Sequence, residues 1–269
     1  IIYYKLYTLM ENMKAINFLY KLPIKLNNFY KTNSKKKLII KNKSHKKNIL
    51  NPVTNFDKGF EKVIRKNISK FFSKDGIIGE EFKEKKTKNK NKWIIDPIDG
   101  TKAFIADLPT WSNLIGYLEG NKAIIGMANF PQLKKYYISD GKNSYVIESR
   151  KKIKLRTNKK NNFKKARVLL NFHKGNRFKQ LLKKLNKVNK NISSITLDAL
   201  SYCLLAEGKI DAVIEADLKI YDVAAIIPIV TNAGGFITTW NNNNAIKGGN
   251  ILATSNKKLH YKLLKILRS

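Results

Sequence analysis

The stretch WIIDPIDGT, residues 93–101, joins an apolar segment to a turn that carries two carboxylates. Its first three residues are aromatic or β-branched, which favours a strand that ends at Asp96. Pro97 forces a turn after this strand, and the turn can aim Asp99 and the Ile98 carbonyl at the point that Asp96 faces. Hard cations such as Mg²⁺ bind oxygen ligands of this kind. The stretch therefore predicts a strand that ends in a cation site at the edge of a sheet.

Gly100 and Thr101 extend this prediction to a phosphate. Gly100 has no Cβ, so its backbone can approach a ligand closely. Thr101 would begin a short helix, whose first N–H groups have no partner within the helix and can bind an anion. The alternative is structural, because an Asp-Pro turn followed by an Asp-Gly turn needs no ligand. Taken alone, the stretch fits both interpretations.

The acidic residues of this chain are few, and several of them are clustered. Five of the 19 lie between residues 80 and 99, namely Glu80, Glu81, Glu84, Asp96 and Asp99. A solvated surface is a poor explanation for such a cluster in a chain with 54 lysines and arginines. The clustering therefore favours a cation site.

Hydrophobic periodicity predicts a layered α/β fold rather than a helical bundle or an all-β barrel. A first, amphipathic helix is expected within residues 1–25, with its apolar face formed by Leu6, Leu9, Met10, Met13, Ile16 and Leu19. Residues 31–51 are polar and lysine-rich, which indicates a loop or hairpin near the site. A second helix is expected from Phe56 to Phe71.

The rest of the chain alternates between the two periodicities. Strands are expected at residues 93–96, 111–118, 123–130, 136–139, 167–171, 212–215, 236–239 and 251–254. Helices are expected at residues 176–188 and 221–232 and at the C-terminus up to Arg268. Pro228 would bend the helix over residues 221–232, and Gly234-Gly235 would end it.

The net charge of +35 would ordinarily suggest a polyanionic partner. The lysines, however, occur in every segment and together with many Asn and Ile residues, and the codons of all three are rich in A and T. Genome base composition can therefore produce the bias without a ligand. The dense basic run over residues 83–92 also has no aromatic residue that could stack on a base. We expect no specific nucleic-acid partner.

Cys203 is the only cysteine. This excludes an intramolecular disulfide and a cysteine-based zinc cluster, and it is compatible with a reducing compartment. No apolar run approaches the ~18 residues of a membrane-spanning helix, and residues 1–25 have no signal-peptide cleavage pattern. We expect a cytoplasmic protein without a membrane partner, although the basic segment 1–25 leaves import into an organelle open.

Four segments, in order along the chain, resemble signatures of the inositol monophosphatase superfamily. They are residues 52–57, Gly79-Glu80-Glu81, residues 96–101, and residues 221–225 followed by 231–235. The resemblance extends from about Asn51 to the C-terminus. It implies an αβαβα sandwich of layered α+β class. It also implies a homodimer of single 1–269 units, each with a metal-site half (1–149) and a C-terminal half (150–269).

The resemblance further implies a magnesium-dependent phosphomonoesterase. Matched position by position, the metal ligands would be Glu80, Asp96, the Ile98 carbonyl, Asp99, Asp222 and, at an outer and weaker site, Asp57. Two or three Mg²⁺ ions would neutralise the phosphate and lower the pKa of a bound water. Glu80 and Thr101 would orient and deprotonate this water for in-line attack, with Asp57 as the third catalytic residue. Glu81 and Glu84 are interpreted as supporting or solvent-facing acids.

Within the superfamily, the chain is most similar to the histidinol-phosphate phosphatase branch. Tyr221 precedes the last metal aspartate, where inositol-type members usually have Trp. Glu215 matches a substrate-contacting acid that could pair with the ammonium group of histidinol. The residues that the resemblance assigns to the substrate are Gly100, Thr101, Asp198, Glu215 and Asp222.

Some positions depart from the pattern of this branch. Ala103 and Asp107 stand where a small polar residue and Gly are usual, and Thr196-Leu197 precede Asp198 where small residues are favoured. These departures leave inositol monophosphate or another small sugar or nucleotide ester open as the substrate. A polyanion-binding protein on a decayed phosphatase scaffold is the alternative from another class, although the complete set of acids disfavours decay.

Overall fold

The largest part of the fold is a seven-stranded sheet that contains residues 93–99 of the stretch quoted above. The computed structural model describes residues 2–43, 52–159, 163–171 and 176–268. The strands are β3 (Gly76–Gly79), β4 (Asn91–Asp99), β5 (Ser112–Glu119), β6 (Lys122–Phe130), β7 (Lys135–Ser139), β8 (Ser144–Glu148) and β9 (Lys151–Lys154). They lie side by side in sequence order. Neighbouring strands are antiparallel except β3 and β4, which are parallel.

A second, five-stranded sheet is formed by the C-terminal part of the chain. Its strands are β10 (Val168–Leu170), β11 (Ile192–Ser193), β12 (Ala212–Leu218), β13 (Phe236–Thr239) and β14 (Gly249–Thr254). Their spatial order is β11-β10-β12-β14-β13, and β10 is parallel to both of its neighbours. A short antiparallel pair, β1 (Ile40–Asn42) and β2 (Pro52–Thr54), precedes the large sheet in the sequence.

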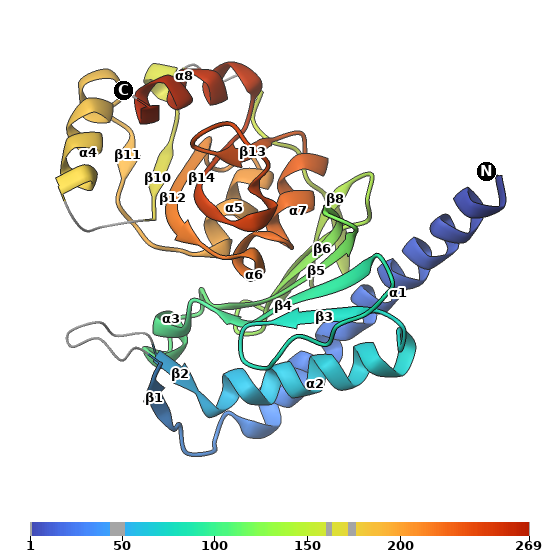
Figure 1. The fold of residues 1–269 in the computed structure, drawn as a ribbon. Helices are drawn as coiled ribbons and strands as arrows, with labels where there is room; N and C mark the ends of the chain where they lie inside the picture. The colour runs from blue at the N-terminus through green and yellow to red at the C-terminus, as the bar shows by residue number, and fades with distance from the viewer. Residues whose placement is uncertain (1, 44–51, 160–162, 172–175, 269) are drawn as a thin grey trace.

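Helices cover both sheets and fill the space between them (Figure 1). They are α1 (Ile2–Asn33), α2 (Asn55–Phe71), α3 (Thr101–Ile105), α4 (Asn176–Val188), α5 (Ala199–Ala206), α6 (Ile220–Val223), α7 (Ile226–Asn232) and α8 (Lys257–Arg268), with 3₁₀ turns at Phe163–Lys165 and Ala245–Lys247. The outer layers are α1 with α2 on the large sheet and α4 with α8 on the small one. Because α5, α6 and α7 lie between the sheets, the predicted αβαβα sandwich is confirmed. Among the described residues, no helix combines the length and the apolarity needed to cross a membrane.

The prediction for the first helix is wrong in its extent and in four of the six residues of its apolar face. The helix continues to Asn33, beyond residue 25. Leu19 is buried, but the apolar residues of its first turns are exposed, namely Leu6, Leu9, Met10 and Met13. The helix is longer than the face that it covers, and its N-terminal turns extend past the sheet (Figure 1). Among the helix residues whose exposure is described, the buried hydrophobic ones are Ala15, Leu19, Leu22 and Leu26.

The predicted helix over residues 221–232 is divided in two, and the predicted bend at Pro228 is wrong. The break between α6 and α7 falls at Ala224-Ala225. Pro228 lies in the first turn of α7, where the N–H that proline lacks would have no partner within the helix, so it is tolerated without a bend. Gly234, with φ 92°, follows the end of α7, as expected for a helix-terminating glycine.

The predicted hairpin within residues 31–51 is partly described. Residues 31–33 belong to α1, and β1 then pairs with β2, while residues 44–51 lie outside the described part of the chain. The strands β3, β8, β9 and β11 were not predicted, because they are short or too rich in lysine and glycine to show clear alternation.

Candidate active site

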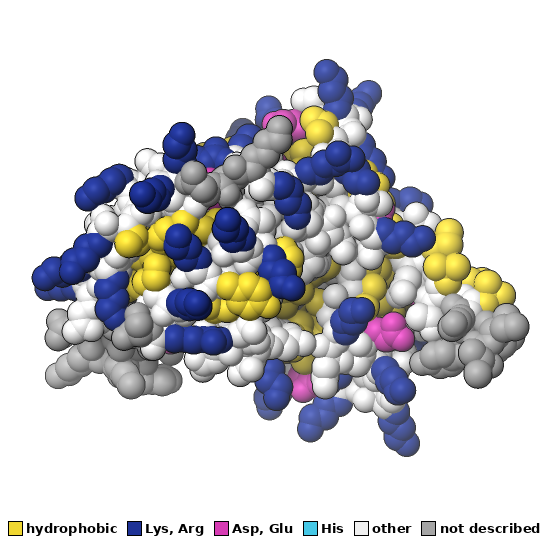
Figure 2. All heavy atoms as spheres, turned by 90° about the horizontal axis from the view of Figure 1, so that it is seen from above, with side chains coloured by type: hydrophobic (Ala, Val, Ile, Leu, Met, Phe, Trp, Pro, Cys, Tyr) yellow, Lys and Arg dark blue, Asp and Glu magenta, His cyan; other side chains and the backbone are white. Residues whose placement is uncertain are grey.

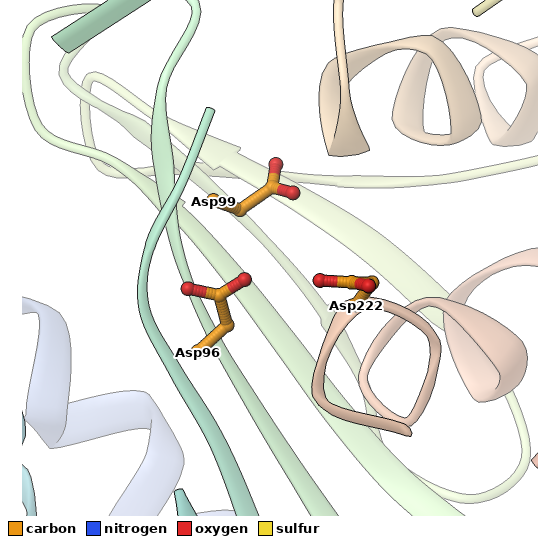
Figure 3. A group of neighbouring side chains, drawn as sticks. All are labelled: Asp96, Asp99 and Asp222. Carbon is orange, nitrogen blue, oxygen red and sulfur yellow. The ribbon is translucent and has the colours of Figure 1, made fainter. Parts of the chain in front are cut away.

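Three aspartates meet at the point where β4 ends and α6 begins. Asp96 and Asp99 come from β4 and Asp222 from α6, and their side chains point toward one another (Figure 3). One carboxylate oxygen of each lies within 4.8 Å of the others. Asp96 and Asp99 are only 3% and 9% exposed. Residues that are more than 120 positions apart in the sequence thus form one group, in which Asp96 and Asp99 are buried and Asp222 is partly exposed.

A bulge in β4 explains how two aspartates three residues apart reach the same side. In a regular strand their side chains would point to opposite faces of the sheet. Asp96 pairs with Leu114 and Asp99 with Ser112, so two residues of β4 lie opposite one residue of β5. The extra residue restores a common direction for the two carboxylates. This is the structural use of the Asp-Pro-Ile-Asp sequence.

Buried amides hold the bulge in place. The side-chain N–H of Asn113, opposite the bulge, donates to the Pro97 carbonyl at 2.6 Å. Asn129 in turn donates to Asn113 at 2.9 Å. Within the turn, the Ile98 N–H donates to Asp96 Oδ1 at 3.0 Å. The carbonyl of the proline and the amide after it are therefore both fixed.

Two glycines allow α6 to approach the large sheet closely enough to deliver Asp222. A Cβ on Gly116 of β5 would lie 2.8 Å from the carbonyl carbon of Ala224. A Cβ on Gly126 of β6 would lie 2.0 Å from the carbonyl oxygen of Ala225. Any side chain at these positions would push the α6–α7 junction, and Asp222 with it, away from β4.

Burial and the charges of nearby carboxylates raise the pKa of all three aspartates. Burial is the main cause at each position, and it raises the pKa of Asp222 to about 6. For Asp96, the charges of Glu80, Asp99 and Asp222 add to the effect. For Asp99, the charge of Asp198 does so. Like-charged buried carboxylates are unfavourable without a compensating cation, and an all-oxygen donor set suits Mg²⁺. The group therefore fits a divalent metal.

Glu80 lies beside the three aspartates, but it is not one of the residues whose carboxylate oxygens lie within 4.8 Å of one another. Its backbone N–H donates to the Ile95 carbonyl of β4 at 3.2 Å. Its carboxylate accepts a hydrogen bond from Lys43 Nζ at 2.9 Å, and Lys43 also pairs with Glu81. The Glu81 side chain is 3% exposed, so of the two interpretations given for it the solvent-facing one is wrong. Glu84, 37% exposed and 3.5 Å from Lys92, does face solvent.

Asp57 and Thr101 form a second pair at the edge of the group. Asp57 Oδ2 accepts from the backbone N–H and the hydroxyl of Thr54, both at 2.6 Å, in a capping box at the start of α2. Its other oxygen faces Thr101 Oγ1 at 3.5 Å. The Thr101 hydroxyl also lies 3.1 Å from the Ile98 carbonyl. One carboxylate thus both caps a helix and contacts the predicted catalytic threonine.

Asp198 and Glu215 lie on the side of the C-terminal half. A Cβ on Gly100 would be 2.7 Å from Asp198 Oδ2, so this carboxylate sits directly over the Gly100 backbone. Glu215 in β12 is 6% exposed and accepts hydrogen bonds from the Tyr202 hydroxyl at 2.7 Å and from Asn171 at 3.2 Å. Burial raises the pKa of Glu215 to about 8, and the charges of Asp198 and Asp222 contribute. Both acids thus lie within electrostatic reach of Asp222.

The sequence interpretation missed three residues that support this site: Lys43, Asn113 and Glu61. Lys43 lay in a lysine-rich loop with no distinguishing pattern. Asn113 looked like one polar position of an alternating strand. Glu61 did leave a signal, because it stands among Phe60 and Ile64 on the apolar face of α2. A charged residue at a core position of a helix indicates a specific buried partner.

Comparisons with known proteins show the family of the chain. The profile of the inositol monophosphatase family matches residues 11–269. The histidinol-phosphatase of Mycobacterium tuberculosis is 30% identical over 219 residues, which are 80% of this chain and 84% of that protein. The fructose-1,6-bisphosphatase/inositol-1-monophosphatase of Aquifex aeolicus is 30% identical over 196 residues, 69% and 71% of the two chains. A solved structure of an IMPase/NADP phosphatase complexed with Mg²⁺ and phosphate has a TM-score of 0.83 at 19% identity and covers 96% of this chain and 97% of that one. The chain therefore belongs to the inositol monophosphatase family, whose members are metal-dependent, and it is a phosphatase of small phosphoric monoesters.

Proposed function

We propose that this phosphatase hydrolyses histidinol phosphate to histidinol and inorganic phosphate with two or three Mg²⁺ ions. The observation that carries the metal chemistry is the group of Asp96, Asp99 and Asp222, whose carboxylate oxygens lie within 4.8 Å of one another. The observation that carries the substrate is the pair of acids next to this group, the buried Glu215 and the partly exposed Asp198. Relatives named histidinol-phosphatase support the choice.

The proposed metal ligands are those that the resemblance implies, namely Glu80, Asp96, the Ile98 carbonyl, Asp99, Asp222 and Asp57. Bound Mg²⁺ would supply charge for the phosphate oxygens and acidify a water molecule. The Asp96 bulge and the glycine-dependent approach of α6 hold these residues in place before the ion arrives. Such preorganisation reduces the reorganisation needed during catalysis.

The chain's own residues would handle the attacking water. Glu80 accepts its proton, since the carboxylate stands beside the aspartate group and its backbone is tied to β4. The Thr101 hydroxyl donates a hydrogen bond to Asp57 or to the Ile98 carbonyl. Its oxygen lone pairs then stay able to accept a hydrogen bond from the water and so to orient it. The backbone N–H groups at Gly100 and Thr101 would bind the phosphate. No covalent intermediate is required.

Glu215 and Asp198 would recognise the substrate. In the absence of a cation, the Glu215 carboxyl holds a proton at neutral pH, because burial raises its pKa to about 8. A positively charged group beside it lowers that pKa and ionises the carboxyl. An ammonium ion such as that of histidinol therefore suits this position better than a neutral hydroxyl does.

A panel of esters assayed with Mg²⁺ tests the proposal. It contains histidinol phosphate, inositol monophosphate, fructose 1,6-bisphosphate, a nucleoside monophosphate and an aryl phosphate. The highest kcat/KM is expected for histidinol phosphate. A higher kcat/KM for inositol monophosphate or fructose 1,6-bisphosphate would overturn the choice of histidinol phosphate. The substrate would then be one of those in the name of the relative called fructose-1,6-bisphosphatase/inositol-1-monophosphatase. No hydrolysis of any ester would refute the proposal.

Replacement of Glu215 by glutamine should change which ester is preferred. Loss of kcat/KM for histidinol phosphate should exceed the loss for a neutral aryl phosphate by about tenfold or more, because truncating a desolvated ion pair costs ~2–5 kcal/mol and tenfold corresponds to about 1.4 kcal/mol. Steady-state kinetics on both esters measures this ratio.

Asp217→Asn is the matched control, because Asp217 is an exposed acid two residues further along β12. This variant should leave the preference unchanged. Equal losses on both esters in Glu215→Gln would assign Glu215 to support of the metal site instead.

The positive charge should give only weak and non-specific binding to nucleic acid. Figure 2 shows Lys and Arg side chains spread over the face it draws rather than gathered in one stripe. Scattered lysines release counterions without reading bases, so binding to DNA or RNA should be lost by moderate salt. Fluorescence anisotropy of labelled duplexes across a salt series measures this. A sequence-selective complex that persists would favour the polyanion-binding alternative.

Assembly and compartment rest on the resemblance alone. We propose that the chain forms a homodimer, as the family implies. The buried single cysteine, Cys203, is compatible with the reducing cytoplasm, which we propose as its compartment.

A further inference from the structure

A buried glutamate on α2 lies directly behind the Glu80 turn. Glu61 is fully buried, with an exposed fraction of 0%. It is one turn beyond Asp57 in the same helix, but its carboxylate points to the segment that follows β3 rather than to the aspartate group. The family signatures found in the sequence do not include it.

Glu61 binds the backbone of the two residues that follow Glu80. Its Oε2 accepts the N–H of Glu81 at 2.7 Å, and its Oε1 accepts the N–H of Phe82 at 3.3 Å. The N–H of Glu80 donates to Ile95 at 3.2 Å. Three consecutive backbone donors are therefore held, one by β4 and two by a single side chain.

Arg65 completes the arrangement. Its Nε donates to Glu61 Oε1 at 2.6 Å, and its terminal nitrogen donates to the Phe82 carbonyl at 3.1 Å. The guanidinium thus compensates the buried carboxylate and contacts the same turn. A buried carboxylate that accepts three hydrogen bonds in a fixed geometry is a rigid support.

The sequence makes room for this carboxylate at one position. A Cβ on Gly79 would lie 2.0 Å from Glu61 Oε1. Glycine before Glu80 is therefore needed so that Glu61 can reach the turn, and not for a special backbone angle at that residue, which has no positive φ.

We propose that Glu61, together with Arg65, is a positioning residue that fixes the Glu80 carboxylate for metal binding and proton transfer. It acts through the backbone of residues 80–82 and touches neither substrate nor metal. The inference deepens the proposed function and rests on it for the role of Glu80.

Glu61→Gln is the test variant, because it keeps the size of the side chain but replaces one acceptor by a donor. The amide N–H₂ must then face either the Glu81 N–H or both the Phe82 N–H and Arg65 Nε, so at least one hydrogen bond is lost. Residues that orient metal ligands typically change activity or metal affinity by about 10–100-fold when mutated. We expect kcat to fall by that factor with little change in KM, and the Mg²⁺ concentration for half-maximal activity to rise.

Asp211→Asn provides a matched control. Asp211 is also buried and also accepts both a backbone N–H and a guanidinium, from Arg167 at 2.8 Å and 3.1 Å, while Arg167 donates to the Gly208 carbonyl. It has the same local chemistry at the start of β12, away from Glu80. Both variants should lower Tm, but only Glu61→Gln should lower kcat.

Two measurements do not depend on turnover. Backbone amide exchange at Glu81 and Phe82 in metal-free protein should accelerate in Glu61→Gln and stay unchanged in Asp211→Asn. Calorimetric titration with Mg²⁺ alone should show weaker binding in Glu61→Gln. If the wild type hydrolysed no ester, the proposed function would fail, while these two measurements would still decide the role of Glu61.

Gly79→Ala approaches the same contact from the other side. The added Cβ must displace the Glu61 carboxylate, so the kinetic defect should resemble that of Glu61→Gln, and the double variant should be little worse than either single one. The inference is overturned if Glu61→Gln retains the wild-type kcat and Mg²⁺ affinity. It is also overturned if Asp211→Asn loses as much kcat.

Discussion

Asp96→Asn is expected to reduce kcat/KM by about 10³-fold or more at saturating Mg²⁺, with the fold retained. Asp96 is the most buried of the three aspartates in the group and the one on which the charges of Glu80, Asp99 and Asp222 converge. Removing its charge weakens the binding of adjacent cations. Their stabilisation of transition-state charge is worth several kcal/mol. A loss of about 4 kcal/mol of this stabilisation corresponds to a 10³-fold lower rate. Initial rates over a Mg²⁺ series measure the effect.

The fold should survive because asparagine preserves the local hydrogen bond. Asn Oδ1 can still accept the Ile98 N–H that Asp96 Oδ1 accepts at 3.0 Å. Glu84→Gln serves as the control, since Glu84 belongs to the same acidic segment but faces solvent. It should keep near-normal activity. Near-normal turnover of Asp96→Asn at saturating Mg²⁺ would contradict the assignment of Asp96 to the metal site.

Thermal unfolding provides a second measurement on Asp96→Asn. A carboxyl whose pKa is raised in the folded state contributes stability at low pH that is lost as pH rises through the folded-state pKa. Burial raises the pKa of Asp96 well above its ordinary value, so metal-free wild type should lose stability as the pH increases into this range. The variant lacks this penalty, so without metal its Tm at neutral pH should be no lower than that of wild type. Added Mg²⁺ should raise Tm more in wild type.

Much of the fold could be predicted because its signals are local. The layered class follows from apolar periodicity. The end of β4 was mispredicted at Asp96, because the bulge that keeps the strand paired with β5 as far as Asp99 cannot be read from a local apolar run before Asp-Pro. The N-terminal turns of α1 were mispredicted for the same reason, since apolar spacing shows which face a helix could bury but not where its packing partner ends. Pro228 was misinterpreted because its effect depends on its position within a helix, and the start of α7 is set by the packing of Ala224 and Ala225 against glycines of the sheet.

The acids of the metal site could be predicted from the sequence, but the residues that hold these acids in place could not. Asp96 and Asp99 stand in one motif, whereas the approach of Asp222 could be inferred only from the family resemblance, because it depends on Gly116 and Gly126 in other strands. The pairing of Lys43 with Glu80 and of Glu61 with the next two amides joins segments about 20 to 40 residues apart. Hydrogen bonds of this kind leave no periodicity in a sequence.

Glu80→Gln is expected to lower kcat by about 10²–10⁴-fold, the range typical for loss of a general base. Glutamine has nearly the same shape, so the turn held by Ile95 and Glu61 should not move. It cannot accept the proton of the attacking water, and it offers the metal a neutral oxygen in place of a charged one. Measuring kcat at increasing Mg²⁺ separates the two roles, because the deficit that remains at saturation reports the loss of the base.

Glu81→Gln is the appropriate comparison for Glu80→Gln. Both acids pair with Lys43, so each variant leaves this lysine one charged partner. The backbone of Glu81 is held by Glu61 whichever side chain it carries. A general defect from the loss of one Lys43 ion pair would therefore appear in both variants. If Glu80 is the base, kcat at saturating Mg²⁺ must fall much further in Glu80→Gln than in Glu81→Gln. Equal losses of kcat in the two variants would assign the effect to the Lys43 ion pairs and would show that Glu80 is not the base.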